Sequence, residues 1–145
     1  GIILTQQTHW GTLAETVDDT LFLIKKINRD NFAITFEPAN LMACGGKYNV
    51  DALKTLLPYI VNFYFQNIIL DHNGKHVFKT YRNGNVKVSY VPLDDNRGIP
   101  IDPLLILLKE MNYKGWVTVH QPLLDRQDID EAIKEAANVF MPYRA

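Results

Sequence analysis

The chain has 145 residues, of which 47% are hydrophobic and 21% charged, which predicts one globular domain with a real core rather than a disordered or fibrous chain. Its formal net charge is −1 and its longest basic run is the pair Lys25 and Lys26, so nothing in the charge pattern favours nucleic-acid binding. A lone cysteine, Cys44, and the lack of any long apolar stretch lead us to expect a cytoplasmic protein with neither nucleic-acid nor membrane partners.

The first third of the chain reads as strand, helix and strand. An apolar run over residues 2–4 predicts the first strand. Thr16 followed by Asp19 resembles a helix capping box, and the apolar residues behind it recur at helical spacing, which predicts a helix over residues 17–27. A second apolar run, over residues 32–36, predicts the second strand.

The middle of the chain continues with a predicted loop, helix and strand. Residues 41–46 include a Gly-Gly pair and read as a loop. Asn49 can cap a helix over residues 50–57, which Pro58 limits. Residues 60–65 are apolar and predict the third strand.

A hairpin interrupts this alternation of strands and helices. Residues 76–82 and 86–91 alternate in polarity on either side of Asn83 and Gly84, a strong hairpin signal. The hairpin follows the end of the third strand, where such loops cover substrates in many α/β folds, although a plain surface hairpin fits equally well.

The last part of the chain returns to helix and strand. Asp102, followed by a proline, predicts the cap of a helix over residues 103–111. Residues 115–119 predict the fourth strand. A box-like pair that starts at Asp128 predicts the beginning of a final amphipathic helix.

The predicted order is βα, βα, β-hairpin-α, βα, which indicates an α/β fold with a parallel sheet. No glycine-rich phosphate fingerprint follows the first strand, which argues against a dinucleotide-binding open sheet. We therefore expect the (βα)4 half of a TIM barrel, with a β-hairpin insertion after the third strand. Residues 1–145 are expected to be a single domain and, because the chain starts abruptly in an apolar run, a fragment of a longer (βα)8 chain.

Each predicted strand ends in polar side chains that can bind ligands. The carboxyl ends of parallel strands meet at one edge of a sheet, and ligands bind there. The candidate site residues at these ends are Gln7, His9, Trp10, Glu37, Asn40, Gln66 and His120.

Four ordered motifs carry a family resemblance. They are THWGTLAET at residues 8–16, NFAITFEPANL at 31–41, FYFQN at 63–67 and NYKGWVTVHQP at 112–122. Together they resemble the xylose-isomerase-like TIM-barrel family of sugar isomerases and epimerases, and specifically its carboxyl-terminal half, over residues 6–140.

The resemblance implies a site in which four strand ends supply Glu, Asp or Glu, His and Glu to one divalent metal, Mn, Zn, Mg or Co. The corresponding residues here are Gln7, Glu37, Tyr64 and His120. Glu37, His120 and Gln7 are then the metal ligands, and Glu37 and His120 the catalytic residues. Gln7 is a neutral amide that cannot act as a base, and a neutral Tyr64 is a poor ligand for a hard ion.

The substrate-binding residues implied by the resemblance are His9, Trp10, Asn40 and Gln66. The leading hypothesis is a sugar isomerase or epimerase-like protein that binds a small sugar or polyol through the metal. A non-catalytic barrel that binds a ligand or a partner chain, and a lyase or hydrolase with His120 as base, are the alternatives. Because a half-barrel leaves strand edges open, we expect it to associate with a missing amino-terminal half or with a second copy.

Overall fold

The structure is a computed structural model that describes residues 1–144. Four parallel strands form one sheet in the order β1-β2-β3-β7. They are β1 (Leu4–Gln7), β2 (Phe32–Phe36), β3 (Ile60–Phe65) and β7 (Trp116–Val119). The order and direction of these strands confirm the predicted half of a TIM barrel.

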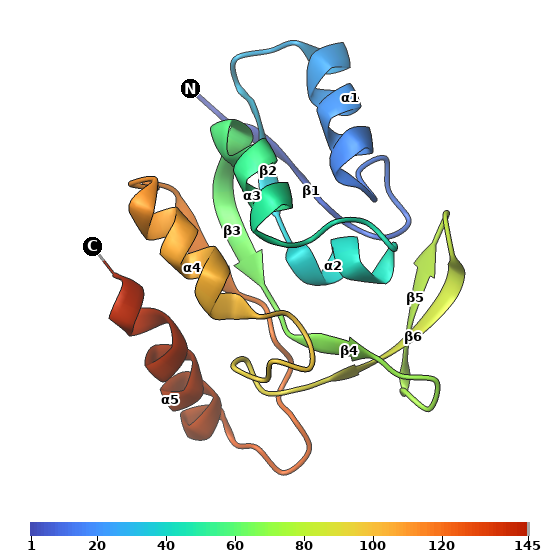
Figure 1. Ribbon diagram of the computed structural model, residues 1–145, viewed down its shortest axis with the longest axis vertical. Helices are drawn as coiled ribbons and strands as arrows, with labels where there is room; N and C mark the ends of the chain where they lie inside the picture. Colours follow the sequence, from blue (N-terminus) through green and yellow to red (C-terminus); the bar gives the residue numbers. More distant parts are fainter. Residues whose placement is uncertain (145) are drawn as a thin grey trace.

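Helices connect the strands and cover one side of the sheet (Figure 1). They are α1 (Val17–Ile27), α2 (Pro38–Ala43), α3 (Val50–Leu56), α4 (Ile101–Glu110) and α5 (Ile129–Phe140), with short 3-10 turns at Leu57–Tyr59 and Met141–Tyr143. The predicted boundaries of α1, β2 and β3 are confirmed.

A second, antiparallel sheet follows the carboxyl end of β3 (Figure 1). It has the order β4-β6-β5 and consists of β4 (Ile68–Leu70), β5 (His76–Thr80) and β6 (Gly84–Tyr90). The predicted insertion is confirmed. It contains one more strand than expected, because β4 pairs with the second arm of the hairpin.

The two faces of the parallel sheet differ in chemistry. Phe36, Phe63 and Phe65 are fully buried beneath the helices, and the Phe65 ring meets Phe140 of α5 edge-on at 5.9 Å between centroids. Successive residues of a strand point to opposite faces. The residues between these phenylalanines, and their neighbours on the other strands, therefore form a polar inner face.

Asn49 caps α3 as predicted, accepting from the Ala52 N–H at 3.3 Å, and short-range signals placed two further helix starts well. The Thr16 hydroxyl accepts a hydrogen bond from the Asp19 backbone N–H at 3.1 Å. Asp128 and Glu131 form a complete capping box at the start of α5. Both interactions span three residues, so the local sequence contains all that they need.

Several predicted boundaries were wrong, including those of the hairpin arms, which lie at His76–Thr80 and Gly84–Tyr90 rather than at residues 76–82 and 86–91. The first strand lies at Leu4–Gln7 rather than residues 2–4, because backbone pairing with β2 extends through the polar residues. Part of the expected loop 41–46 belongs to α2, which Pro38 starts in its first turn. The cap of α4 is Pro100, so Asp102 lies in the first turn instead.

Both edges of the parallel sheet carry exposed apolar residues. Within residues 1–144, β1 pairs only with β2, and β7 pairs only with β3. Leu4 on β1 and Trp116 on β7 are 64% and 79% exposed, and Ile129 and Ile133 of α5 are also largely exposed. None of the helices in this part of the chain has the length and apolar character to cross a membrane.

Candidate functional site

Glu37 is the centre of a buried hydrogen-bonded cluster on the inner face. It follows β2 directly, at the N-cap position of α2, and its side chain has no exposed surface. Carboxylate oxygen Oε2 accepts from the amides of Gln7 and Asn40, the latter at 2.8 Å, and Oε1 accepts from the amide of Gln66. These four residues, the Glu37 cluster, bring together the ends of β1, β2 and β3.

Thr8 holds this cluster in place through the backbone. Its hydroxyl accepts from the Glu37 N–H at 2.7 Å and contacts the Glu37 carbonyl at 3.2 Å. The Asn40 amide also donates to the Thr8 carbonyl at 3.1 Å. The end of β1 is thereby tied to the start of α2. Sequence reasoning missed this role of Thr8, since its partners lie about thirty residues away along the chain.

Burial changes the acid–base behaviour of Glu37. Removal from water raises the pKa of its carboxyl to about 7, although the amide hydrogen bonds from Gln7 and Gln66 oppose this shift. The pKa of Tyr90, on β6, is also raised, mainly by burial and in part by the charge of Glu37. A carboxyl that titrates near neutral pH can both hold and release a proton.

Two amide oxygens of the cluster have no partner. The Asn40 and Gln66 side chains direct their N–H groups to Glu37, and their oxygens Oδ1 and Oε1 are buried without a hydrogen bond within the structure. Buried polar atoms nearly always have partners in folded proteins. These two oxygens can therefore accept hydrogen bonds from a ligand or from ordered water.

His120 lies on the other, open part of the inner face. It follows β7, is exposed, and stacks on Tyr64 at 4.8 Å between ring centroids. One level below, Thr118 and Asn62 are joined by a 3.0 Å hydrogen bond. Tyr64 and His120 therefore share a face, as expected. In the described residues no hydrogen bond joins His120 to the Glu37 cluster.

His9 and Trp10 contact their local surroundings. The Nδ1–H of His9 donates to the Trp10 carbonyl at 2.7 Å, and the two rings lie 4.7 Å apart. Trp10 stacks on Phe78 of β5 at 5.3 Å. These contacts connect the β1–α1 loop to the hairpin sheet, and a substrate-binding role for either residue stays a prediction.

Glu15 is a second buried carboxylate, which sequence reasoning missed. Its oxygens accept from the backbone N–H groups of Gly11, Tyr81 and Arg82 at 2.7–3.1 Å, and it is 1% exposed. The residue fastens the tip of the β5–β6 hairpin to the β1–α1 loop. No sequence pattern signals this, because the donors are backbone groups and two of them are more than sixty residues away.

The donor set does not fit the divalent metal that the resemblance implies. Within residues 1–144, no group of three His, Cys, Asp or Glu side chains could hold a metal ion. Glu37 is the one carboxylate of its cluster, and both its oxygens already accept amide hydrogen bonds. Mg²⁺ and Mn²⁺ depend largely on carboxylate oxygens. The predicted ligands Gln7 and His120 do not make up this deficit.

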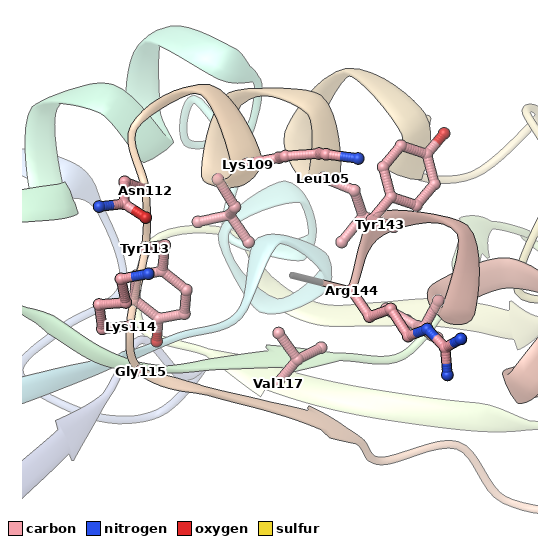
Figure 2. Close-up of a pocket in the computed structure, with 11 residues that line it drawn as sticks. Leu105, Lys109, Asn112, Tyr113, Lys114, Gly115, Val117, Tyr143 and Arg144 are labelled. Carbon is pink, nitrogen blue, oxygen red and sulfur yellow. The ribbon is translucent and has the colours of Figure 1, made fainter.

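A pocket of about 420 Å³ lies elsewhere, between α4, β7 and α5 (Figure 2). Leu105 of α4 and Val117 of β7 line it from opposite sides, and Lys109, Lys114 and Arg144 are also among its lining residues. It lies at the amino end of β7, whereas the Glu37 cluster lies at the carboxyl ends of the strands. None of the predicted site residues lines it.

Several solved structures share this fold. A probable 3-DHS dehydratase, AsbF, from Bacillus anthracis is 23% identical, with a TM-score of 0.69 over 94% of this chain and 48% of that one. A xylose isomerase domain protein from Planctomyces limnophilus is 19% identical, with a TM-score of 0.65 over 94% and 44%. A xylose isomerase-like TIM barrel protein from Mycobacterium smegmatis, in complex with magnesium, is 17% identical, with a TM-score of 0.66 over 100% and 46%.

The chain thus spans about half the length of the solved structures that it matches. No curated protein sequence matches it. The family described as xylose isomerase-like TIM barrel matches residues 1–143, nearly the whole chain, and the parallel sheet with its polar inner face agrees with that match. The chain belongs to the xylose isomerase-like TIM barrel family.

Proposed function

We propose that the inner face binds a small sugar or polyol at the carboxyl ends of the strands. The observation that carries this proposal is the pair of buried, unpartnered oxygens of Asn40 and Gln66 beside Glu37. Each needs a donor, and the hydroxyl groups of a sugar or polyol are hydrogen-bond donors. Membership of the family supports the same class of ligand.

Binding without catalysis suits this arrangement better than proton transfer. Glu37 has no exposed surface, and Gln7 and Gln66 occupy its oxygens. A catalytic base must reach the proton that it removes. The proposal therefore takes the non-catalytic alternative as its first form, and it needs no metal.

Titration of the full-length protein with xylitol and D-xylose, followed by calorimetry, tests this proposal. Gln66→Met keeps the length of the side chain but removes both the acceptor oxygen and the N–H group that donates to Glu37, and should weaken binding about tenfold. Gln6→Met is the matched control, because the Gln6 amide bonds only to the neighbouring Gln7 carbonyl and alternation along β1 turns it to the other face. Equal affinities in the two variants, or no binding by the wild type, would contradict the proposal.

Isomerase or epimerase activity is the second candidate, and the pKa of about 7 for Glu37 favours it. Such a carboxyl could take a proton from the carbon beside a carbonyl group if a ligand displaced the amide of Gln7. The same first step serves a dehydratase, as the Bacillus anthracis neighbour is described, and His120 is the alternative base. Exchange of the substrate's α-proton with D2O would be lost in Glu37→Gln or in His120→Ala, according to which is the base. If the wild type catalyses no exchange, the isomerase candidate is contradicted and ligand binding is the one function still proposed.

We further propose that a companion of four parallel strands completes the barrel. The open edges at β1 and β7, with exposed apolar residues at both, support this, as does the twofold greater length of the structural neighbours. An amino-terminal half of a longer chain and a second copy are both suitable companions. Light scattering separates them, since a second copy doubles the chain mass of 16.6 kDa. A stable 16.6 kDa monomer whose β1 and β7 amides resist hydrogen exchange would overturn the proposal.

A further inference from the structure

Glu37 is a buried carboxylate without a positive partner. A carboxylate that leaves water normally needs a cation or several hydrogen-bond donors. No Lys, Arg or His side chain in residues 1–144 forms an ion pair with Glu37. Its side-chain partners are the amides of Gln7, Asn40 and Gln66. Three neutral N–H groups thus occupy the positions around Glu37 that a cation would otherwise take.

The orientation of the amides bears on which ions the cluster can accept. A carboxylate oxygen only accepts hydrogen bonds, so the nitrogen of each amide faces Glu37. The oxygens of Asn40 and Gln66 consequently face elsewhere and have no partner. A metal ion would require the opposite orientation, with amide oxygens turned inward. The cluster is therefore arranged for a cation-free site.

We infer that the amides of Gln7, Asn40 and Gln66 take the place of a metal ion at Glu37, and that the amide at position 7 keeps divalent metal out. Gln7 donates to Glu37 from β1 and is the half-buried member of the Glu37 cluster. A carboxylate at this position would face Glu37 directly, and two like charges in a buried site repel unless a cation lies between them.

A single substitution should therefore convert the Glu37 cluster into a site for a divalent metal ion. Gln7→Glu adds a second carboxylate, and the unpartnered oxygens of Asn40 and Gln66 can turn inward to complete an oxygen-only set for Mn²⁺ or Mg²⁺. This inference concerns the metal alone. It does not depend on which sugar or polyol binds.

Titration of the full-length protein with MnCl2, followed by calorimetry and by metal analysis after dialysis, provides the test. Gln7→Glu should bind Mn²⁺ at least about tenfold more tightly than the wild type, because affinity for such ions rises with the number of carboxylate ligands. Gln6→Glu is the matched control. It adds the same charge one residue away, on the opposite face of β1, and should bind no more tightly than the wild type.

Wild-type protein with stoichiometric Mn²⁺, or equal affinity in Gln7→Glu and Gln6→Glu, would overturn the inference. If Gln7→Glu unfolds in the absence of metal, its melting temperature with and without MnCl2 decides instead. Refolding with Mn²⁺ supports the inference, and failure to refold contradicts it. If the wild type binds no sugar or polyol but the Mn²⁺ titrations give the expected results, only the proposed function is contradicted. The two failures are therefore distinguishable.

Discussion

The inner face of the sheet has two parts that differ in burial and in bonding. The Glu37 cluster, where β2 has a strand on each side, is buried and both carboxylate oxygens are occupied. Tyr64 and His120, beside the open edge of β7, are partly or fully exposed and meet only by stacking. The strand ends that meet around the Glu37 carboxylate are thus bonded to one another, whereas the side chains next to the open edge of β7 remain accessible to a ligand or a companion.

The largest expected effect on stability comes from disrupting the Glu37 cluster. Glu37→Ala should lower the free energy of unfolding by about 4 kcal/mol, because it leaves three amide groups buried without an acceptor. Urea denaturation measures this change. Glu110→Ala, at the exposed end of α4, is the matched control and should change stability little. Similar values for the two variants would mean that the cluster contributes no more than a surface residue.

The next effect is on pH dependence. The folded-state pKa of Glu37 is raised from 4.5 to about 7, so the folded protein binds this proton more tightly than the unfolded chain does. Stability from this group is fully present below pH 4.5 and is lost as pH rises to about 7, by about 3 kcal/mol in total.

Unfolding free energies of the wild type and Glu37→Gln, measured between pH 4 and 8 in steps, would test this (about 1.4 kcal/mol per pKa unit). The difference between the two curves isolates the contribution of Glu37 from those of the other titratable groups. A wild-type curve parallel to that of the variant would show that Glu37 titrates normally.

The smallest expected effect concerns the open part. His120→Ala removes a stacking contact from an exposed site and should cost about 0.5 kcal/mol of stability. The same urea denaturation, compared with that of Glu37→Ala, measures the difference between the two parts. A loss of unfolding free energy as large as that of Glu37→Ala would mean that His120 is coupled to the Glu37 cluster.

Several features of the site were within reach of sequence reasoning. The sequence predicts that four polar residues after apolar strands take part in the site, and the structure joins all four, Glu37, Asn40, Gln7 and Gln66. The prediction that they lie at one edge needed only the parallel topology. That Gln7 and Gln66 donate to Glu37 was not predictable, because hydrogen-bond partners twenty-nine or thirty residues apart leave no local pattern.

By itself, the sequence determined the four strands of the parallel sheet and most helices, the parallel α/β order, and the family. It could do so because periodicity, caps such as Thr16 and Asp128, and ordered motifs act over a few residues. Only the tertiary structure decided that Glu37 is buried among three amide groups, that Glu15 fastens the hairpin, and that His120 is exposed. Burial and hydrogen-bond partners depend on which strands lie side by side, and that is a property of the folded sheet.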